Sequence, residues 1–267
     1  MNGEFSLVYI LGTGHCGSTL LNLLLNGHSQ AIALSEIDKI SNYIGLETSA
    51  DNPLNLKFWQ HVKQCYETRF SKSFEQVELS LPSNEKKTKD WAQTNAELFS
   101  CILYHSNATT LVDASKGLKR LYLLQASGLF NIKVIHMVRD GRAVLNSYYR
   151  KYGNFKTGFR PWLSLHLKAP FVRKHFSQNA WLQLHYEQLA TNPETTLQKI
   201  CDFLGWEFEE DMLTYKKHPY VGIGGNRMRK QNTEAIYLDE SWKSELSGWN
   251  SIKFDLLVGW LNKYYGY

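Results

Sequence analysis

The sequence predicts an α/β fold in which helices cover both faces of a central, mostly parallel sheet. Two observations support this fold class. Apolar runs of strand length alternate with helical segments, and two of these runs end in a turn that leads directly into a helix. We find no internal repeat and no Pro/Gly/Ser-rich linker, so we predict a single domain spanning residues 1–267.

The first unit is a strand at residues 5–11, a glycine turn and a leucine-dense helix at 19–26. Residues 82–90 are polar and are expected to form a surface loop. The helix at 193–204 begins at a proline and ends before a glycine. We expect further strands at 31–34, 110–112, 132–138 and 181–186, and further helices at 54–70, 90–104, 117–125 and 143–149, which makes a sheet of five strands or a similar number.

Composition excludes several classes of protein. A net charge of +5 suits an anionic ligand but falls short of a basic face for nucleic acid, so we expect no nucleic-acid partner. The four cysteines form no CxxC pair, which argues against a metal site and a disulfide framework. No apolar run approaches the length of a membrane span and no signal peptide is evident, so we expect a cytoplasmic protein.

The glycine turn is the strongest local signal. Residues 12–19 read Gly-Thr-Gly-His-Cys-Gly-Ser-Thr, a spacing that aims successive backbone N–H groups at an anion at the start of a helix. Ser18 stands where nucleotide triphosphatases carry a lysine, which weakens a prediction of ATP or GTP hydrolysis. The alternative is a glycine turn that binds no phosphate.

A second strand-to-helix junction predicts another anion site. Residues 134–147 read Val-Ile-His-Met-Val-Arg-Asp-Gly-Arg-Ala-Val-Leu-Asn-Ser, so a buried strand delivers Arg139 and the following helix presents Ser147 two turns later. A guanidinium and a hydroxyl can converge there on one anion. An ordinary ion pair between Arg139 and Asp140 is the alternative. Two anion sites at strand ends suit one ligand with phosphates at both ends.

Both motifs resemble those of sulfotransferases that use 3′-phosphoadenosine-5′-phosphosulfate (PAPS), with closest likeness to the prokaryotic and tyrosylprotein branches. The resemblance implies a three-layer fold of P-loop type and an enzyme that moves a sulfuryl group from PAPS to an acceptor hydroxyl by in-line displacement, leaving adenosine 3′,5′-bisphosphate. No metal is required. It implies donor contacts from Gly14, His15, Cys16, Gly17, Ser18, Thr19, Arg139 and Ser147. His15 departs from the family, which usually has lysine or arginine there, although a neutral imidazole can donate one hydrogen bond and a protonated one can stabilise leaving-group charge.

The same resemblance suggests catalytic residues. Glu36 lies at the distance after the loop where these branches carry the base, and His15 is the second candidate. The alternative on local grounds is a surface glutamate that opens a helix after a serine cap. Lys116, in a strand-end segment that resembles the one brought to the transferred group, is expected to neutralise transition-state charge, unless it is simply an exposed helix-start lysine.

The C-terminal half resembles the family more loosely. Tyr186 is expected near the nucleotide, with core packing as the alternative. Residues 224–229 resemble the late loop that closes over PAPS, which implicates Asn226 and Arg229, unless this is a basic surface turn. Residues 40–106 are a possible helical cap over the acceptor site. The acceptor class stays open among sugars, lipids, peptide tyrosines and small metabolites, and a P-loop nucleotide or small-molecule kinase or a non-catalytic nucleotide-binding module are the alternative functions.

Overall fold

The computed structural model describes residues 5–46, 49, 51–225, 235–246 and 248–267. Its centre is a five-stranded sheet with strand order β2-β3-β1-β4-β5, and every pairing is parallel. The predicted α/β class and parallel sheet are confirmed. The strands are β1 (Phe5–Leu11), β2 (Ala31–Ser35), β3 (Thr110–Lys116), β4 (Phe130–Val138) and β5 (Trp181–His185).

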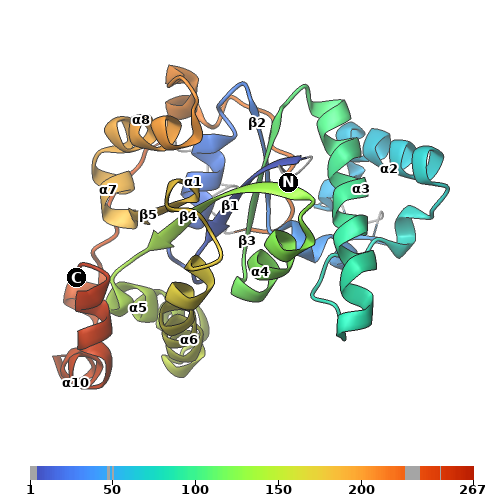
Figure 1. The fold of residues 1–267 in the computed structure, drawn as a ribbon. Coiled ribbons are helices and arrows are strands. Elements are labelled where there is room, and N and C mark those ends of the chain that lie inside the picture. Colours follow the sequence, from blue (N-terminus) through green and yellow to red (C-terminus); the bar gives the residue numbers. More distant parts are fainter. Residues whose placement is uncertain (1–4, 47–48, 50, 226–234, 247) are drawn as a thin grey trace.

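Helices cover both faces of the sheet (Figure 1). The α-helices are α1 (Ser18–Leu25), α2 (Lys57–Phe70), α3 (Thr88–Ser106), α4 (Leu118–Ser127), α5 (Gly141–Tyr152), α6 (Lys156–Arg173), α7 (Tyr186–Thr191), α8 (Pro193–Leu204), α9 (Trp242–Glu245) and α10 (Gly248–Tyr264). Short 3-10 helices are η1 (Ile37–Asn42), η2 (Pro53–Asn55), η3 (Phe74–Gln76), η4 (Glu85–Lys87), η5 (Gln178–Ala180) and η6 (Glu210–Thr214). None of the helices in the described ranges is long and apolar enough to cross a membrane.

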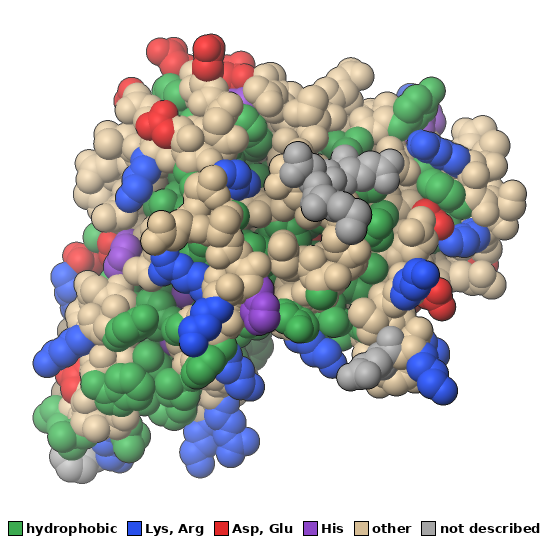
Figure 2. Space-filling model, in the orientation of Figure 1, with side chains coloured by type: hydrophobic (Ala, Val, Ile, Leu, Met, Phe, Trp, Pro, Cys, Tyr) green, Lys and Arg blue, Asp and Glu red, His purple; other side chains and the backbone are tan. Residues whose placement is uncertain are grey.

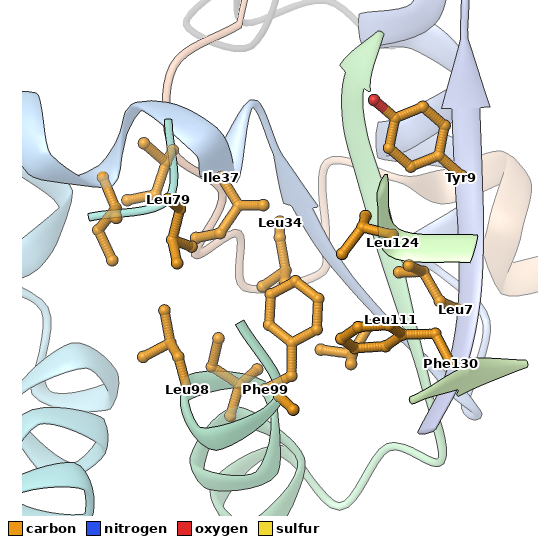
Figure 3. Packing of buried hydrophobic residues seen from close by; sticks show 14 of the residues in the cluster. Leu7, Tyr9, Leu34, Ile37, Leu79, Leu98, Phe99, Leu111, Leu124 and Phe130 are labelled. Carbon is orange, nitrogen blue, oxygen red and sulfur yellow. The ribbon is translucent and has the colours of Figure 1, made fainter. Parts of the chain in front are cut away.

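The alternation of side chains along β1 divides the core into two layers. Leu7 belongs to the cluster under α3 and α4, whereas Val8 belongs to the cluster under α1, α7 and α8. Figure 3 shows Phe99 of α3 directed at Phe130 of β4, with Leu7 beside them. The two phenyl rings lie 5.8 Å apart in an edge-to-face arrangement. The sheet is therefore buried on both sides, as parallel sheets are.

The carboxyl ends of the strands depart from regular geometry. Pairing of β1 and of β2 with β3 shifts register near these ends, as β-bulges do beside functional sites. Five non-glycine residues in the described part of the chain have a left-handed φ, and three of them, His15, Ser35 and Lys116, lie just after or at the ends of neighbouring strands. Such backbone costs about 1–3 kcal/mol per residue and tends to gather where function requires it.

Several elements differ from the sequence-based expectation. The third strand runs four residues further, to Lys116, and Tyr186 begins α7 instead of ending the last strand. The polar stretch 82–90 already contains η4 and the start of α3. The sequence reading placed no helix at α6, whose pattern is interrupted by Pro161 and Pro170, nor at α10, which is apolar around much of its circumference.

Candidate functional site

The strand ends open into a cavity of about 660 Å³. The described residues that line it come from separate parts of the chain: the glycine turn and the start of α1, the segment after β2, the end of β3, the end of β4, α5, the start of α7 and the stretch before α9. They are Gly14, His15, Gly17, Ser18, Thr19, Leu20, Glu36, Lys39, Lys116, Arg139, Ser147, Tyr148, Arg150, Lys151, Tyr152, Tyr186, Gly225, Ala235, Ile236, Tyr237 and Asp239.

Two glycines of the turn pack so closely against tyrosine side chains that neither position can accept a Cβ. Gly17, with φ of +93°, is the N-cap of α1, and an added Cβ would meet the ring of Tyr186 at 2.4 Å. A Cβ on Gly14 would meet the hydroxyl of Tyr148 at 2.3 Å. No side chain caps the start of α1, and a helix N-terminus of this kind attracts an anion. The turn thus has the geometry of the predicted anion site.

Cys16 stands apart from its neighbours in this turn. Its side chain is 1% exposed and belongs to the core cluster under α1. Burial raises the pKa of its thiol, which keeps it protonated and unreactive. The main chain of Cys16, and not its side chain, is therefore suited to the predicted contact with the donor.

Arg139 joins the two predicted anion sites. It follows β4 and is 6% exposed. Its Nη1 donates to the carbonyl oxygen of His15 at 2.9 Å, and its Nη2 donates to the carbonyl oxygen of Asp239 at 2.9 Å. The guanidinium also lies over the ring of Tyr186, 4.3 Å from its centroid. The predicted proximity of Arg139, the glycine turn and Tyr186 is present in the structure.

The helix after Arg139 supplies more polar groups. Ser147 lines the cavity, and in this structure its hydroxyl donates to the carbonyl of Ala143 at 3.0 Å. Arg150 and Lys151 line the same cavity one turn later. Figure 2 shows basic side chains at the lower left of this face, over α5 and α6, and also on its right-hand part, whereas acidic side chains gather at the top left. Arg150 and Lys151 thus add positive charge to the cavity wall.

Glu36 lies between two ammonium groups at the end of β2. Lys116 forms an ion pair with Oε1 and Lys39 with Oε2. Burial raises the pKa of Glu36, but the two lysines outweigh it and bring the pKa down to about 2. The carboxylate is therefore ionised at neutral pH and able to accept a proton, although weakly while both lysines hold it.

The imidazole of His15 is neutral. Burial lowers its pKa most, and the charges of Lys151, Arg139 and Lys116 lower it further, to about 4. The ring packs edge-on against Tyr148, with 4.8 Å between the ring centroids. Of the two states considered from the sequence, the free protein therefore has the neutral hydrogen-bond donor and not the cation.

A buried ion pair and its hydrogen bonds hold the end of β3, which carries Lys116. Asp113 is fully buried, accepts a hydrogen bond from the backbone N–H of Ser115 at 2.8 Å, and pairs with Arg120 at 3.0 Å. The same guanidinium donates to the carbonyl of Leu79 and to the side chain of Asn95. The strand end that presents Lys116 is thereby tied to α3 and α4.

Residues 223–225, which are distant from Glu36 in sequence, lie beside it in the structure. Ile223 bridges to the end of β2 through hydrogen bonds of 2.9 Å, which places Gly224 against the Glu36 side chain and Gly225 on the cavity wall. Asn226 and Arg229, predicted from the same loop, lie outside the described residues.

Sequence reasoning missed several cavity residues, among them Lys39, Tyr148 and Asp239. Lys39 is three residues after Glu36, the spacing of a helical ion pair, and this was the available signal. Asp239 carried no local signal. Across the described ranges, no three His, Cys, Asp or Glu side chains are grouped so that they can hold a metal ion.

Comparison with known proteins points to one family. A model described as the sulfotransferase family matches residues 8–210. Rat sulfotransferase 2A1 is 34% identical over 148 residues, which are 49% of this chain and 51% of the rat protein, so the match spans about half the length of that curated relative.

Solved structures share the fold. The sulfotransferase domain of the Synechococcus PCC 7002 olefin synthase superposes with a TM-score of 0.66 at 20% identity, covering 100% of this chain and 96% of that domain. Mouse sulfotransferase SULT7A1, solved with PAP, gives 0.51 at 11% identity, covering 96% and 84%. These likenesses confirm the predicted three-layer fold.

Proposed function

Because the chain belongs to the sulfotransferase family, we propose that it is an enzyme that transfers a sulfuryl group from PAPS to an acceptor hydroxyl and releases adenosine 3′,5′-bisphosphate. The main supporting observation is the 2.9 Å hydrogen bond from Arg139 to the carbonyl of His15. This contact brings the two anion sites within reach of one nucleotide that carries a charged group at each end.

The donor would be held at both ends. The amides from Gly14 to Thr19 and the N-terminus of α1 would bind the 5′-phosphosulfate, with help from the hydroxyls of Ser18 and Thr19. Arg139 and Ser147 would bind the 3′-phosphate, after the Ser147 hydroxyl turns away from its bond to the helix backbone. Tyr186 would pack beside the nucleotide. Asn226 and Arg229 stay predictions.

Transfer requires a base and a cation, which Glu36 and Lys116 would supply. The acceptor oxygen forms a bond to sulfur while the bond from sulfur to the bridging oxygen breaks, and the electron pair of that bond stays on the 5′-phosphate. Glu36 would take the acceptor proton. Lys116 would leave Glu36 for the anionic donor, which raises the proton affinity of the carboxylate and places an ammonium near the charge that develops on the bridging oxygen.

His15 would serve the donor and not act as the base. Its pKa of about 4 leaves the ring neutral, so it can give one hydrogen bond to the bridging oxygen without adding charge. The lysine or arginine usual in the family would contribute a full charge here. In this chain Lys116 and Lys151, whose charges help to lower the His15 pKa, would provide it instead.

The acceptor and the cellular setting belong to the same proposal. We propose a hydroxyl acceptor without choosing among sugar, lipid, peptide tyrosine and metabolite. None of the described cavity residues comes from 40–106, so a cap formed by this part of the single domain would meet the acceptor farther out. Four unpaired cysteines support a cytoplasmic location. A nucleotide kinase is less well supported, because Ser18 stands at the usual lysine position.

The test separates donor binding from chemistry. Wild-type protein, Glu36→Gln and Arg139→Ala would be incubated with radiolabelled PAPS and a panel of hydroxyl acceptors, and bisphosphate binding would be measured by calorimetry. We expect Glu36→Gln to lose about 10²–10⁴-fold in transfer because it cannot take the proton, while its bisphosphate affinity changes less than about threefold. Arg139→Ala should bind the bisphosphate roughly 10–100-fold more weakly.

A different experimental result would contradict each part of the proposal. Transfer by Glu36→Gln at the wild-type rate would remove Glu36 as the base. Unchanged bisphosphate affinity in Arg139→Ala would remove the 3′-phosphate site. Bisphosphate binding with no transfer to any acceptor, and no effect of Glu36→Gln on any property, would favour the non-catalytic nucleotide-binding module.

A further inference from the structure

The cavity already holds a carboxylate where a phosphate is expected. Residues 235–239 run along the cavity wall, and Asp239 is the member of this stretch that reaches Arg139. Its Oδ2 atom lies 3.3 Å from Nη2 of Arg139 and 3.9 Å from Nη1 of Arg150. Two guanidinium groups therefore share one carboxylate.

Hydroxyl and amide groups complete the surroundings of this carboxylate. The Oδ1 atom of Asp239 accepts hydrogen bonds from the hydroxyl of Ser241 at 2.7 Å and from its backbone N–H at 3.2 Å. Arg150 donates to the same hydroxyl at 3.0 Å. Guanidinium, hydroxyl and amide donors are the groups that proteins use to bind phosphate. The donors around Asp239 are therefore of the kinds that bind phosphate, and they hold a carboxylate.

The backbone of the segment is fixed in the same place. The hydroxyl of Tyr186 bonds to the N–H of Asp239 at 3.3 Å and to the carbonyl of Tyr237 at 3.4 Å. The Asp239 carbonyl accepts from Arg139 at 2.9 Å. Burial raises the pKa of Asp239, but hydrogen bonds from Ser241 and the charge of Arg139 outweigh it, so the group is anionic at neutral pH. Arg139 thus has an anionic partner before any nucleotide arrives.

We infer that Asp239 is an internal competitor for the 3′-phosphate subsite, a residue that must leave Arg139 and Arg150 before the donor binds and that takes them back when the bisphosphate product departs. The inference rests on the proposed function. A carboxylate and a phosphate at one guanidinium repel each other, so the two occupants exclude one another. Asp239 would thereby weaken binding of 3′-phosphorylated nucleotides selectively, and it would favour release of the product.

The experiment compares two nucleotides and two variants. Calorimetry would measure adenosine 3′,5′-bisphosphate and adenosine 5′-monophosphate on wild type, Asp239→Asn and Glu240→Gln. Glu240 is a matched control, because it is the next residue, its side chain is 50% exposed, and it pairs with Lys243. We expect Asp239→Asn to bind the bisphosphate about five- to tenfold more tightly, at the low end of coupling between two occupants. Affinity for the monophosphate should change less than about twofold, and Glu240→Gln should match the wild type.

The outcomes are separable. Equal or weaker bisphosphate binding by Asp239→Asn, with wild-type thermal stability, overturns the inference and leaves the donor site intact. An equal gain for both nucleotides also overturns it, because the effect would then not act through the 3′-phosphate. If neither wild type nor Asp239→Asn binds the bisphosphate, the proposed donor site fails and the inference fails with it. Binding by Asp239→Asn alone supports both. A second variant, Asp239→Ser, should reproduce the gain if removal of the charge is its cause.

Discussion

Glu36 and Asp38 stand two residues apart and have opposite electrostatic surroundings. Glu36 faces the cavity between Lys39 and Lys116, and its pKa is lowered to about 2. Burial raises the pKa of Asp38, and the charge of Asp113 raises it further, against a smaller lowering by Arg120. Its Oδ1 atom is buried and has no hydrogen-bond partner among the described residues.

The difference shows that direct ion pairs and neighbouring anions, more than depth alone, set the pKa values of these two acids apart. Glu36 forms ion pairs with two ammonium groups and is kept ionised for proton transfer. Asp38 also feels the charges of Arg120 and Lys39, but burial and the negative charge of Asp113 outweigh them and raise its pKa. Glu36 is therefore suited to proton transfer, whereas ionisation of Asp38 costs the fold stability.

The largest expected effect comes from removing Arg120, the cation that pairs with Asp113 near Asp38. Arg120→Leu would leave Asp113 buried without its ion pair and the Leu79 carbonyl and Asn95 side chain without a donor. We expect the free energy of unfolding to fall by about 3–5 kcal/mol, measured by urea denaturation at neutral pH. Lys119→Leu, an exposed position on the same helix, is the control and should change it by less than about 0.5 kcal/mol. A loss below about 1 kcal/mol for Arg120→Leu would show that Asp113 does not depend on this cation.

A smaller effect distinguishes the two lysines that form ion pairs with Glu36. Lys116→Met should reduce transfer by about 10²–10³-fold, because an ammonium is lost near the charge that develops in the transition state. Lys39→Met removes a lysine whose side chain is half exposed and should cost less than about threefold. Steady-state rates at saturating PAPS would decide. The reverse order of the two losses would assign the catalytic cation to Lys39.

The smallest effect concerns Asp38 and depends on pH. A carboxyl group whose folded pKa lies above its unfolded value of 3.8 destabilises the fold once the unfolded chain ionises, and this penalty vanishes below that value. Asp38→Asn should therefore raise the free energy of unfolding at neutral pH by up to about 1 kcal/mol. The gain should shrink as the pH falls towards 3.8. A gain that is independent of pH would mean that ionisation of Asp38 is not its cause.

Local sequence patterns predicted those parts of the site that are formed by residues close together in the sequence. The glycine turn before α1 and the run from β4 through Arg139 to Ser147 are continuous in sequence, so both could be identified without the fold. Asp239 could not, because it meets Arg139 across 100 residues and no pattern links them. Arg120 likewise acquires its role from Asn95, 25 residues away. Among helices, α10 was missed because Leu256 and Trp260 are exposed while Val258 and Leu261 are buried, which leaves no amphipathic period.

The left-handed residues have a consequence for engineering a more heat-tolerant variant. Ser71 and Asn107 hold this conformation as the C-caps of α2 and α3, where glycine relieves backbone strain and no cavity residue is altered. His15 and Lys116 hold it at the cavity itself. The same replacement there would relax the backbone and remove the reactive side chain with it. Selection for thermal endurance alone would therefore lead mutations towards the two caps, and selection for turnover would retain the strain at the strand ends.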